Sequence, residues 1–221
     1  MNVSSVDMEG YEADDLIATY ARQAAAQGAE VTIVSSDKDL MQLVDDKITM
    51  LDAMKNKVID FDQVVEKFGV PPEKVIDVQA LAGDSADNVP GIEGIGVKTA
   101  ALLINEYGDL DTLLSRAEEI KQPKRRERLI EQAEMARVSR ELVTLKDDVP
   151  ITVPLDDFAV RELDADVLIP FLEEQSFKSL VVTMRARLGV EGAAETGGAE
   201  APEPGEASYE LVQTEDALRA W

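Results

Sequence analysis

The sequence contains no cysteine and no histidine among its 221 residues. Without cysteine the chain can form no disulfide, has no thiolate nucleophile and offers no thiolate ligand to a metal. Without histidine it lacks the commonest general base, every Ser-His or Cys-His catalytic pair and most kinds of zinc site. Any catalysis must therefore use carboxylates, lysines, hydroxyls or backbone groups.

The sequence also lacks any apolar run long enough to cross a membrane. Its first residues do not show the basic-then-apolar pattern of a signal peptide. We therefore expect no membrane partner and a cytoplasmic location. Apolar residues make up 45% of the chain, which is enough for one sizeable core or two small ones.

Basic residues are scarce, and the formal net charge is −23. Taken whole, this charge disfavours nucleic-acid binding, because phosphates repel acidic surfaces. The charge is uneven, however: residues 1–89 carry 18 acidic and 7 basic side chains, whereas residues 90–146 carry 10 of each. The second segment includes the basic run Lys121–Arg128, which is typical of a solvated helix face but could also contact phosphate.

Hydrophobic periodicity predicts an α/β part followed by a helical part. The α/β part is expected to contain a helix over 12–27 that stops at Gly28, a buried parallel strand over Val31–Ser35, and strands over Ile48–Leu51 and Val58–Phe61. Helices are expected over Asp62–Phe68, Pro72–Ala82, Val97–Tyr107, Leu110–Ala117, Lys124–Thr144, Asp166–Glu174 and Phe177–Leu188.

Composition divides the chain into four predicted segments. Residues 1–61 form the α/β part and 62–188 the helical part, while 189–207 are rich in Gly, Ala, Glu and Pro and read as an acidic flexible linker. Residues 208–221 start another domain, with a strand at Tyr209–Val212 and a helix from Glu215. Because the chain stops inside that helix, we interpret its end as a cut.

Two acidic groups occur in the α/β part. Glu12, Asp14 and Asp15 crowd the first turn of the first helix, where acids also complement the helix dipole. Asp37 and Asp39, in SSDKDL, directly follow the Val31–Ser35 strand. Open α/β sheets build their sites at the carboxyl ends of such strands. The alternative for the second group is a capping box, Ser36-x-x-Asp39.

A third acidic group lies in GDSADNVPG. Asp84 and Asp87 are three residues apart before a turn built from Asn88, Pro90 and Gly91, so an ordinary helix end is the alternative interpretation. If the three groups pack side by side, seven carboxylates meet and need compensation. Mg²⁺ compensates this charge, because it takes carboxylate oxygens as ligands. Two such ions can promote phosphodiester hydrolysis in a protein without histidine.

The segment PGIEGIGVKTAALL indicates a glycine-rich hairpin before a helix. Gly91, Gly94 and Gly96 permit positive φ and close backbone approach, and two isoleucines between them would anchor the hairpin in the core. The following helix offers free N–H groups to a phosphate, with Lys98 and Thr99 beside them. This pattern is typical of a helix–hairpin–helix that holds duplex backbone, and a structural helical corner is the alternative.

Three motifs together resemble one family. GYEADDLIA, VTIVSSDKDLMQLV and LAGDSADNVPGIEGIGVKTAALLI are similar, in this order, to motifs of the 5′-nuclease domain of bacterial DNA polymerase I, which belongs with the flap endonucleases. The resemblance extends from Met1 to about Leu188, and Tyr209–Trp221 resembles the start of the 3′-5′ exonuclease-like domain that follows. It implies the C-terminal part of a PIN-like α/β core, followed by a helical subdomain with a helix–hairpin–helix, also called a helix-three-turn-helix.

The resemblance implies a structure-selective nuclease of DNA replication and repair that removes 5′ flaps and RNA primers. The catalytic, metal-binding residues would be Glu12, Asp14, Asp15, Asp37, Asp39, Asp84 and Asp87, and the DNA-binding residues Gly91, Gly94, Gly96, Lys98 and Thr99. The implied cofactors are two Mg²⁺ or Mn²⁺ ions, with K⁺ at the hairpin. The implied partners are duplex or flap DNA and the rest of the polymerase chain in cis, and we expect a monomer.

The family's domain opens with an Asp-bearing strand, a second Asp and a helical arch, and the eleven residues before Glu12 do not contain them. We therefore expect little cleavage by this chain alone, with an uncovered sheet edge. A non-catalytic duplex-binding module is the alternative to a nuclease. A third hypothesis, an acidic cation-binding scaffold, fits the charge but not the glycine hairpin.

Overall fold

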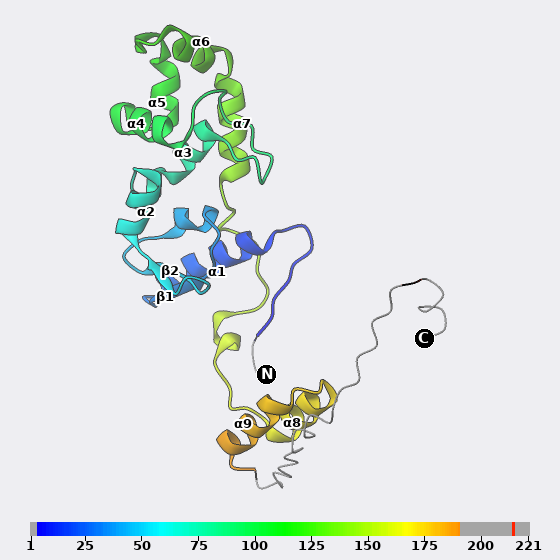
Figure 1. The fold of residues 1–221 in the computed structure, drawn as a ribbon. Helices are drawn as coiled ribbons and strands as arrows, with labels where there is room; N and C mark the ends of the chain where they lie inside the picture. The colour runs from blue at the N-terminus through cyan, green and yellow to red at the C-terminus, as the bar shows by residue number, and fades with distance from the viewer. Residues whose placement is uncertain (1–3, 191–213, 215–221) are drawn as a thin grey trace. The chain divides into compact units, whose positions relative to one another are not determined.

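A computed structural model of the chain describes residues 4–190 and residue 214 (Figure 1). The described chain divides into two compact units, one over residues 4–159 and one that begins at Val160. The strand predicted at 209–212, the helix predicted from Glu215 and most of the predicted linker lie outside the described residues. No helix in the described ranges is both long and apolar enough to cross a bilayer.

A small sheet forms the first part of the 4–159 unit. Its strands are β1 (Val31–Val34), β2 (Ile48–Asp52) and β3 (Lys57–Ile59), in the order β1-β2-β3. β1 is parallel to β2, with Ile33 opposite Met50, and β3 is antiparallel to β2. Ile33 and Met50 are buried on one face, whereas Val34 is 64% exposed on the other. The predicted buried strand is therefore buried on one face only.

Helix α1 (Ala13–Ala26) buries Leu16, Ala18 and Ala21 in this unit. It contacts β1 and the following 3-10 helix η1 (Asp39–Leu43). The chain leaves α1 through Gly28, whose φ of +89° is the left-handed conformation that glycine adopts without strain. The predicted helix and its glycine stop are confirmed.

The remaining elements of the 4–159 unit are helical. They are α2 (Phe61–Phe68), η2 (Pro72–Lys74), α3 (Val75–Ala82), α4 (Val97–Tyr107), α5 (Leu110–Ser115), η3 (Ala117–Glu119), α6 (Pro123–Glu131), α7 (Ala133–Val143) and η4 (Leu155–Phe158). Helix α3 is central, because both α4 and α7 pack against it (Figure 1). Its apolar side chains Val75, Val78 and Leu81 are fully buried in a core that continues into the sheet.

The structure corrects four predicted elements. Phe61 begins α2 rather than ending a strand, because the Asp60 carboxylate caps the helix by accepting the N–H of Asp62. The predicted helix over 124–144 is two helices that meet at Gln132, which has φ −106° and ψ 18°. The helix predicted from Pro72 begins as the 3-10 turn η2, and the helix predicted over Leu110–Ala117 ends at Ser115. The 3-10 helix η1 was not predicted.

The second unit contains a helical hairpin of α8 (Ala165–Glu174) and α9 (Lys178–Leu188). The Asp164 carboxylate caps α8 by accepting the N–H of Asp166 at 2.9 Å. Leu168 and Leu172 of α8 are buried, and the Arg185 guanidinium of α9 lies 2.5 Å from the Glu173 carboxylate. Both helices agree with the predicted ranges to within one residue.

Candidate functional site

Three of the predicted carboxylates converge in the 4–159 unit. Asp39, Asp84 and Asp87 each place one carboxylate oxygen within 4.8 Å of the other two. We call these three residues the acidic cluster. Asp39 opens η1, five residues beyond the end of β1, and the other two lie in the loop that follows α3. The carboxyl end of the parallel strand therefore faces the loop after α3, as predicted for a site in an α/β sheet.

The loop that carries Asp84 and Asp87 is a closed turn directly after the end of α3, so it agrees with the helix-end alternative and also places both carboxylates in the acidic cluster. The Asp84 N–H donates to the Val89 carbonyl at 2.9 Å, and the Val89 N–H donates back at 2.7 Å. The Asp84 carboxylate also accepts the Ala86 N–H at 2.9 Å. Asn88 adopts φ +57°, a left-handed conformation that asparagine tolerates. This closed turn fixes Asp84, whose side chain is only 10% exposed.

The capping-box alternative for the second acidic group is wrong. The Asp39 N–H donates to the Asp37 carboxylate at 2.9 Å, and the Asp37 N–H donates to the Ser35 hydroxyl at 3.0 Å. Ser36 is thus not a cap, since the N-cap of η1 is Lys38 and has no side-chain capping hydrogen bond. Asp37 holds the turn between β1 and η1, which leaves the Asp39 side chain free to enter the acidic cluster.

Two further polar side chains contact the acidic cluster, and sequence reasoning missed both. The Lys38 ammonium contacts the Asp84 carboxylate and lies 3.9 Å from the Asp87 carboxylate. The Gln79 side-chain amide of α3 donates to the Asp39 carboxylate. Gln79 is 3% exposed, and its side-chain oxygen is buried with no hydrogen-bond partner. One signal for the Lys38 contact was present in the sequence, because Lys38 lies between two aspartates. The contact of Gln79 had no such signal.

The charges of the cluster oppose one another. Burial raises the pKa of Asp39, although the Gln79 hydrogen bond acts in the opposite direction. Burial, then the nearby charges of Asp37 and Asp39, raises the pKa of Asp14. Conversely, the hydrogen bond from Lys38 lowers the pKa of Asp84 and raises the pKa of Lys38. Asp14 and Asp37 therefore lie within electrostatic range of the cluster, and one ammonium does not neutralise it.

Glu12 and Asp15 are placed differently from the acidic cluster. The Asp15 carboxylate accepts the Lys146 N–H at 2.9 Å and the Glu12 N–H at 3.2 Å. It therefore caps α1 and fastens the segment after α7 to that helix. Glu12 is exposed. In the described part of the chain, neither side chain belongs to the set that meets within 4.8 Å.

The acidic cluster fits a divalent cation. Its three carboxylates are hard oxygen donors, the ligand type that Mg²⁺ and Mn²⁺ take. Burial raises the pKa of Asp39 despite the Gln79 hydrogen bond and the charge of Lys38, and a dication would stabilise its ionised form further. The partnerless oxygen of Gln79 adds a buried acceptor beside Asp39, where a metal-bound water could donate.

The predicted glycine hairpin follows the acidic loop directly, between α3 and α4. Ile92 and Ile95 are 2% and 3% exposed, so the predicted apolar anchors are confirmed. Gly91 and Gly94 have φ of +60° and +75°. Gly96 instead has φ −96° and serves as the N-cap of α4, so positive φ was wrongly expected there.

The backbone of the hairpin packs closely against the end of α3 and against α7. A Cβ on Gly91 would lie 2.4 Å from the backbone nitrogen of Gly83, so no larger residue fits. The Gly91 N–H donates to the buried Ser139 hydroxyl of α7 at 3.0 Å. The Ile92 N–H donates to the Leu81 carbonyl of α3 at 2.8 Å. These contacts leave Lys98 exposed and Thr99 half-buried at the first turn of α4.

Part of the basic run supports the hairpin from α6. The Arg128 guanidinium donates to the Glu93 carbonyl at 2.9 Å and lies 2.7 Å from the Glu93 carboxylate. The Gln132 side-chain oxygen accepts the Glu93 N–H at 2.9 Å. Arg128 therefore has a structural role, which neither the phosphate-contact interpretation nor the solvated-face interpretation of Lys121–Arg128 anticipated.

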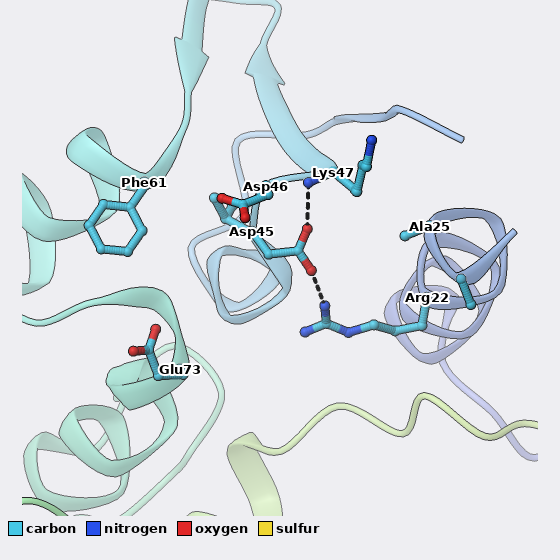
Figure 2. Close-up of a pocket in the computed structure, with 9 residues that line it drawn as sticks. Arg22, Ala25, Asp45, Asp46, Lys47, Phe61 and Glu73 are labelled. Carbon is cyan, nitrogen blue, oxygen red and sulfur yellow. Dashed lines mark hydrogen bonds and ion pairs between the residues drawn. The ribbon is translucent and has the colours of Figure 1, made fainter. Parts of the chain in front are cut away.

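A separate open depression lies between α1 and the start of β2 (Figure 2). The Arg22 guanidinium lies 2.6 Å from the Asp45 carboxylate, which also accepts the Lys47 N–H at 2.8 Å. None of the predicted site residues lines this depression. It lies where the parallel strands begin, whereas Asp37 and Asp39 follow the end of β1.

Comparison with protein families now adds to this geometry. Residues 1–69 match the N-terminal resolvase-like domain of the 5′-3′ exonuclease, and residues 70–166 match its C-terminal SAM fold. The chain belongs to the 5′-3′ exonuclease family of bacterial DNA polymerase I. The predicted fold class, an α/β nuclease part followed by a helical part, is confirmed. The boundary between the two matched domains falls at the end of α2, before the acidic loop and the hairpin.

Relatives of this 5′-3′ exonuclease region are DNA polymerases I. The chain is 59% identical to DNA polymerase I of Rhizobium leguminosarum over 179 residues, which are 81% of this chain and 18% of that protein. It is 39% identical to the thermostable DNA polymerase I of Thermus thermophilus over 82% of this chain and 21% of that protein. The chain thus spans about a fifth of the length of these relatives.

Solved structures of T5 nucleases resemble the chain. The T5 5′-exonuclease matches with a TM-score of 0.59 and 26% identity, over 63% of this chain and 57% of that one. A T5 flap endonuclease, solved as a pseudo-enzyme-product complex with DNA and metal ions, also matches with a TM-score of 0.59 and 26% identity, over 63% and 52%.

Proposed function

We propose that this chain carries the metal-binding and duplex-binding parts of a 5′ nuclease, which hydrolyses phosphodiesters in 5′ flaps and primers. The observation that supports it most is the convergence of Asp39, Asp84 and Asp87 next to the glycine hairpin. One loop between α3 and α4 contains the hairpin and two of these three carboxylates, so a phosphate backbone held by the hairpin would pass near the acidic cluster. The T5 flap endonuclease was solved with both DNA and metal ions, which supports a protein that binds both.

In this proposal Asp39, Asp84 and Asp87 hold Mg²⁺ or Mn²⁺, and the charges of Asp14 and Asp37 add to the negative potential around the ion. The bound ion would supply Lewis acidity and a water of lowered pKa. Gln79 orients Asp39 by its amide hydrogen bond. Glu12 and Asp15, also predicted as ligands, would need a second ion or a changed side-chain conformation to take part.

The hairpin would hold duplex DNA without reading its bases. Free N–H groups at the start of α4 suit a phosphate oxygen, and Lys98 adds a positive charge. Carbonyl groups of the hairpin around Gly91, Gly94 and Gly96 could also hold K⁺. The rest of the polymerase chain would act in cis, and the proposed protein is a cytoplasmic monomer.

A second candidate, duplex binding without cleavage, is favoured by the placement of Asp15. Its carboxylate is engaged by two backbone N–H groups, so three rather than seven carboxylates meet closely. A three-carboxylate cluster can hold one ion, whereas the two-metal mechanism needs ligands for both.

A labelled 5′-flap duplex distinguishes the two candidates. The chain and its Asp84→Asn variant are incubated with the duplex in Mg²⁺, and binding and strand cleavage are measured at several salt concentrations. Cleavage that Asp84→Asn abolishes supports the nuclease. Salt-dependent binding without cleavage supports the second candidate, and absence of binding by the wild-type chain contradicts both.

A further inference from the structure

Lys38 is a cation inside the acidic cluster, and neither proposed function uses it. It lies between Asp37 and Asp39 in the sequence, yet its ammonium points across to the loop after α3. There it contacts the Asp84 carboxylate and lies 3.9 Å from the Asp87 carboxylate. Lys38 thus connects the turn after β1 to the acidic loop, and it engages two of the three proposed ligands.

The ammonium of Lys38 lies on a carboxylate that a divalent cation in the acidic cluster would bind. The Asp84 oxygen that Lys38 contacts is Oδ2, and the same carboxylate already accepts the Ala86 N–H through Oδ1. A metal ion bound to Asp84 needs a lone pair of this carboxylate at about 2.0–2.6 Å. An ammonium held at the same carboxylate would repel that ion at close range, where charges interact strongly.

The Lys38 side chain is able to leave. It is 36% exposed, in contrast to 10% for the Asp84 side chain. Lysine has a flexible four-carbon stem and a strongly hydrated head, so its ammonium can move into solvent with little rearrangement. Asp84 cannot follow it, because backbone hydrogen bonds to Val89 and from Ala86 hold the residue in its turn.

We propose that Lys38 is the internal counter-cation of the metal-free site and that a divalent cation displaces its ammonium from Asp84. This inference rests on the proposed metal site. Lys38 then has two effects: it stabilises the cluster when no metal is bound, and it weakens metal binding because the ion pair must first break. Lys38 is therefore a positioning residue that sets the metal affinity, and it is not itself a ligand.

Calorimetric titration of the full chain with Mn²⁺ measures the affinity effect. The proteins are wild type, Lys38→Met, Lys38→Gln and the matched control Lys57→Met, which removes an exposed ammonium 3.7 Å from Glu66. Both Lys38 variants should bind Mn²⁺ about tenfold more tightly than wild type, within the 5–150-fold typical of coupled sites. Lys57→Met should bind with wild-type affinity.

Thermal unfolding of the same proteins supplies the second readout. In EDTA the Lys38 variants should unfold at a lower temperature than wild type, because the carboxylates then repel one another without a counter-cation. Saturating Mn²⁺ should reduce or abolish this difference in unfolding temperature. Two substitutions of different shape guard against one that fails to fold, and circular dichroism confirms that each variant is folded.

The outcomes separate this inference from the proposed function. Saturable Mn²⁺ binding that Asp84→Asn removes, with equal or weaker affinity in both Lys38 variants, overturns the role of Lys38 and leaves the metal site standing. Wild-type protein without Asp84-dependent Mn²⁺ binding overturns the metal site itself, and the Lys38 inference with it. Tighter Mn²⁺ binding in both Lys38 variants, with wild-type affinity in Lys57→Met, supports the metal site and the role of Lys38.

Discussion

The loop between α3 and α4 contains the glycine hairpin and two of the three residues of the acidic cluster, yet the hairpin and the cluster are stabilised in opposite ways. The hairpin is built from backbone groups whose partners lie within the protein, such as the Gly91 N–H on the Ser139 hydroxyl. The acidic cluster is built from like charges, and burial raises the pKa of Asp39 within it and of Asp14 near it. The hairpin is thus stabilised without a ligand, whereas the carboxylates of the cluster need a cation to offset their repulsion. Substitutions should therefore have opposite effects in the two regions.

The largest effect is expected at Gly91 in the hairpin. Gly91→Ala places a methyl group 2.4 Å from the Gly83 backbone nitrogen in a residue with φ +60°, so the loop between α3 and α4 must shift. We expect the free energy of unfolding to fall by about 3 kcal/mol or more, measured by denaturant titration.

Gly96→Ala is the matched control for Gly91→Ala. Gly96 has φ −96°, and nothing lies within 4 Å of an added Cβ. Its stability should change by about 0.5 kcal/mol or less. Equal losses at the two glycines would contradict the account of a hairpin fixed by close backbone approach.

The next effect tests the hydrogen bond that holds the hairpin to α7. Ser139→Ala removes the fully buried hydroxyl that accepts the Gly91 N–H. The donor is then left without a partner, and the free energy of unfolding should fall by about 1–3 kcal/mol in the same titration. Ser115→Ala is the control, because the Ser115 hydroxyl bonds only the Thr112 carbonyl of its own helix at an exposed position. An equally large loss at Ser115 would refute the special role of Ser139.

A smaller effect of opposite sign is expected at Asp14, which lies within electrostatic range of the acidic cluster. Asp14→Asn removes a charge whose pKa is raised by burial and by Asp37 and Asp39. At pH 7 without metal it should raise Tm by about 1–3 °C, measured by calorimetry in EDTA. A raised pKa means that ionisation of Asp14 destabilises the fold. The gain should therefore vanish as the pH falls below 3.8, the ordinary value, where Asp14 is protonated in both states.

Saturating Mg²⁺ provides the control for Asp14→Asn. The cation compensates the charge that the substitution removes, so the Tm advantage of the variant should shrink or reverse. An advantage that is unchanged by Mg²⁺ and by pH would mean that repulsion within the cluster is not its cause.

The two regions also differ in how far the sequence predicts them. Glycine spacing is a local signal, and the positive φ at Gly91 and Gly94, the buried isoleucines and the start of α4 at Val97 all follow from it. The acidic cluster joins segments that are far apart in the chain. Sequence reasoning identified its three members but could not predict that Asp15 binds the Lys146 N–H, 131 residues away.

The helices and strands likewise follow from the sequence only where a local signal marks them. Helix α4 was predicted with its observed bounds, because glycine and aromatic residues mark its ends. The break at Gln132 was missed, since it coincides with a long-range hydrogen bond from the Glu93 N–H rather than with proline or glycine. The one-sided burial of β1 was missed because an apolar run is compatible with burial on one face or two.

Diffraction from crystals of the full chain soaked in Mn²⁺, recorded at the manganese absorption edge, tests the central claim most directly. The account predicts an anomalous peak bound by carboxylate oxygens of Asp39, Asp84 and Asp87, with the Lys38 ammonium turned away from Asp84. A manganese-saturated crystal with no peak within ligand distance of these three carboxylates would contradict it.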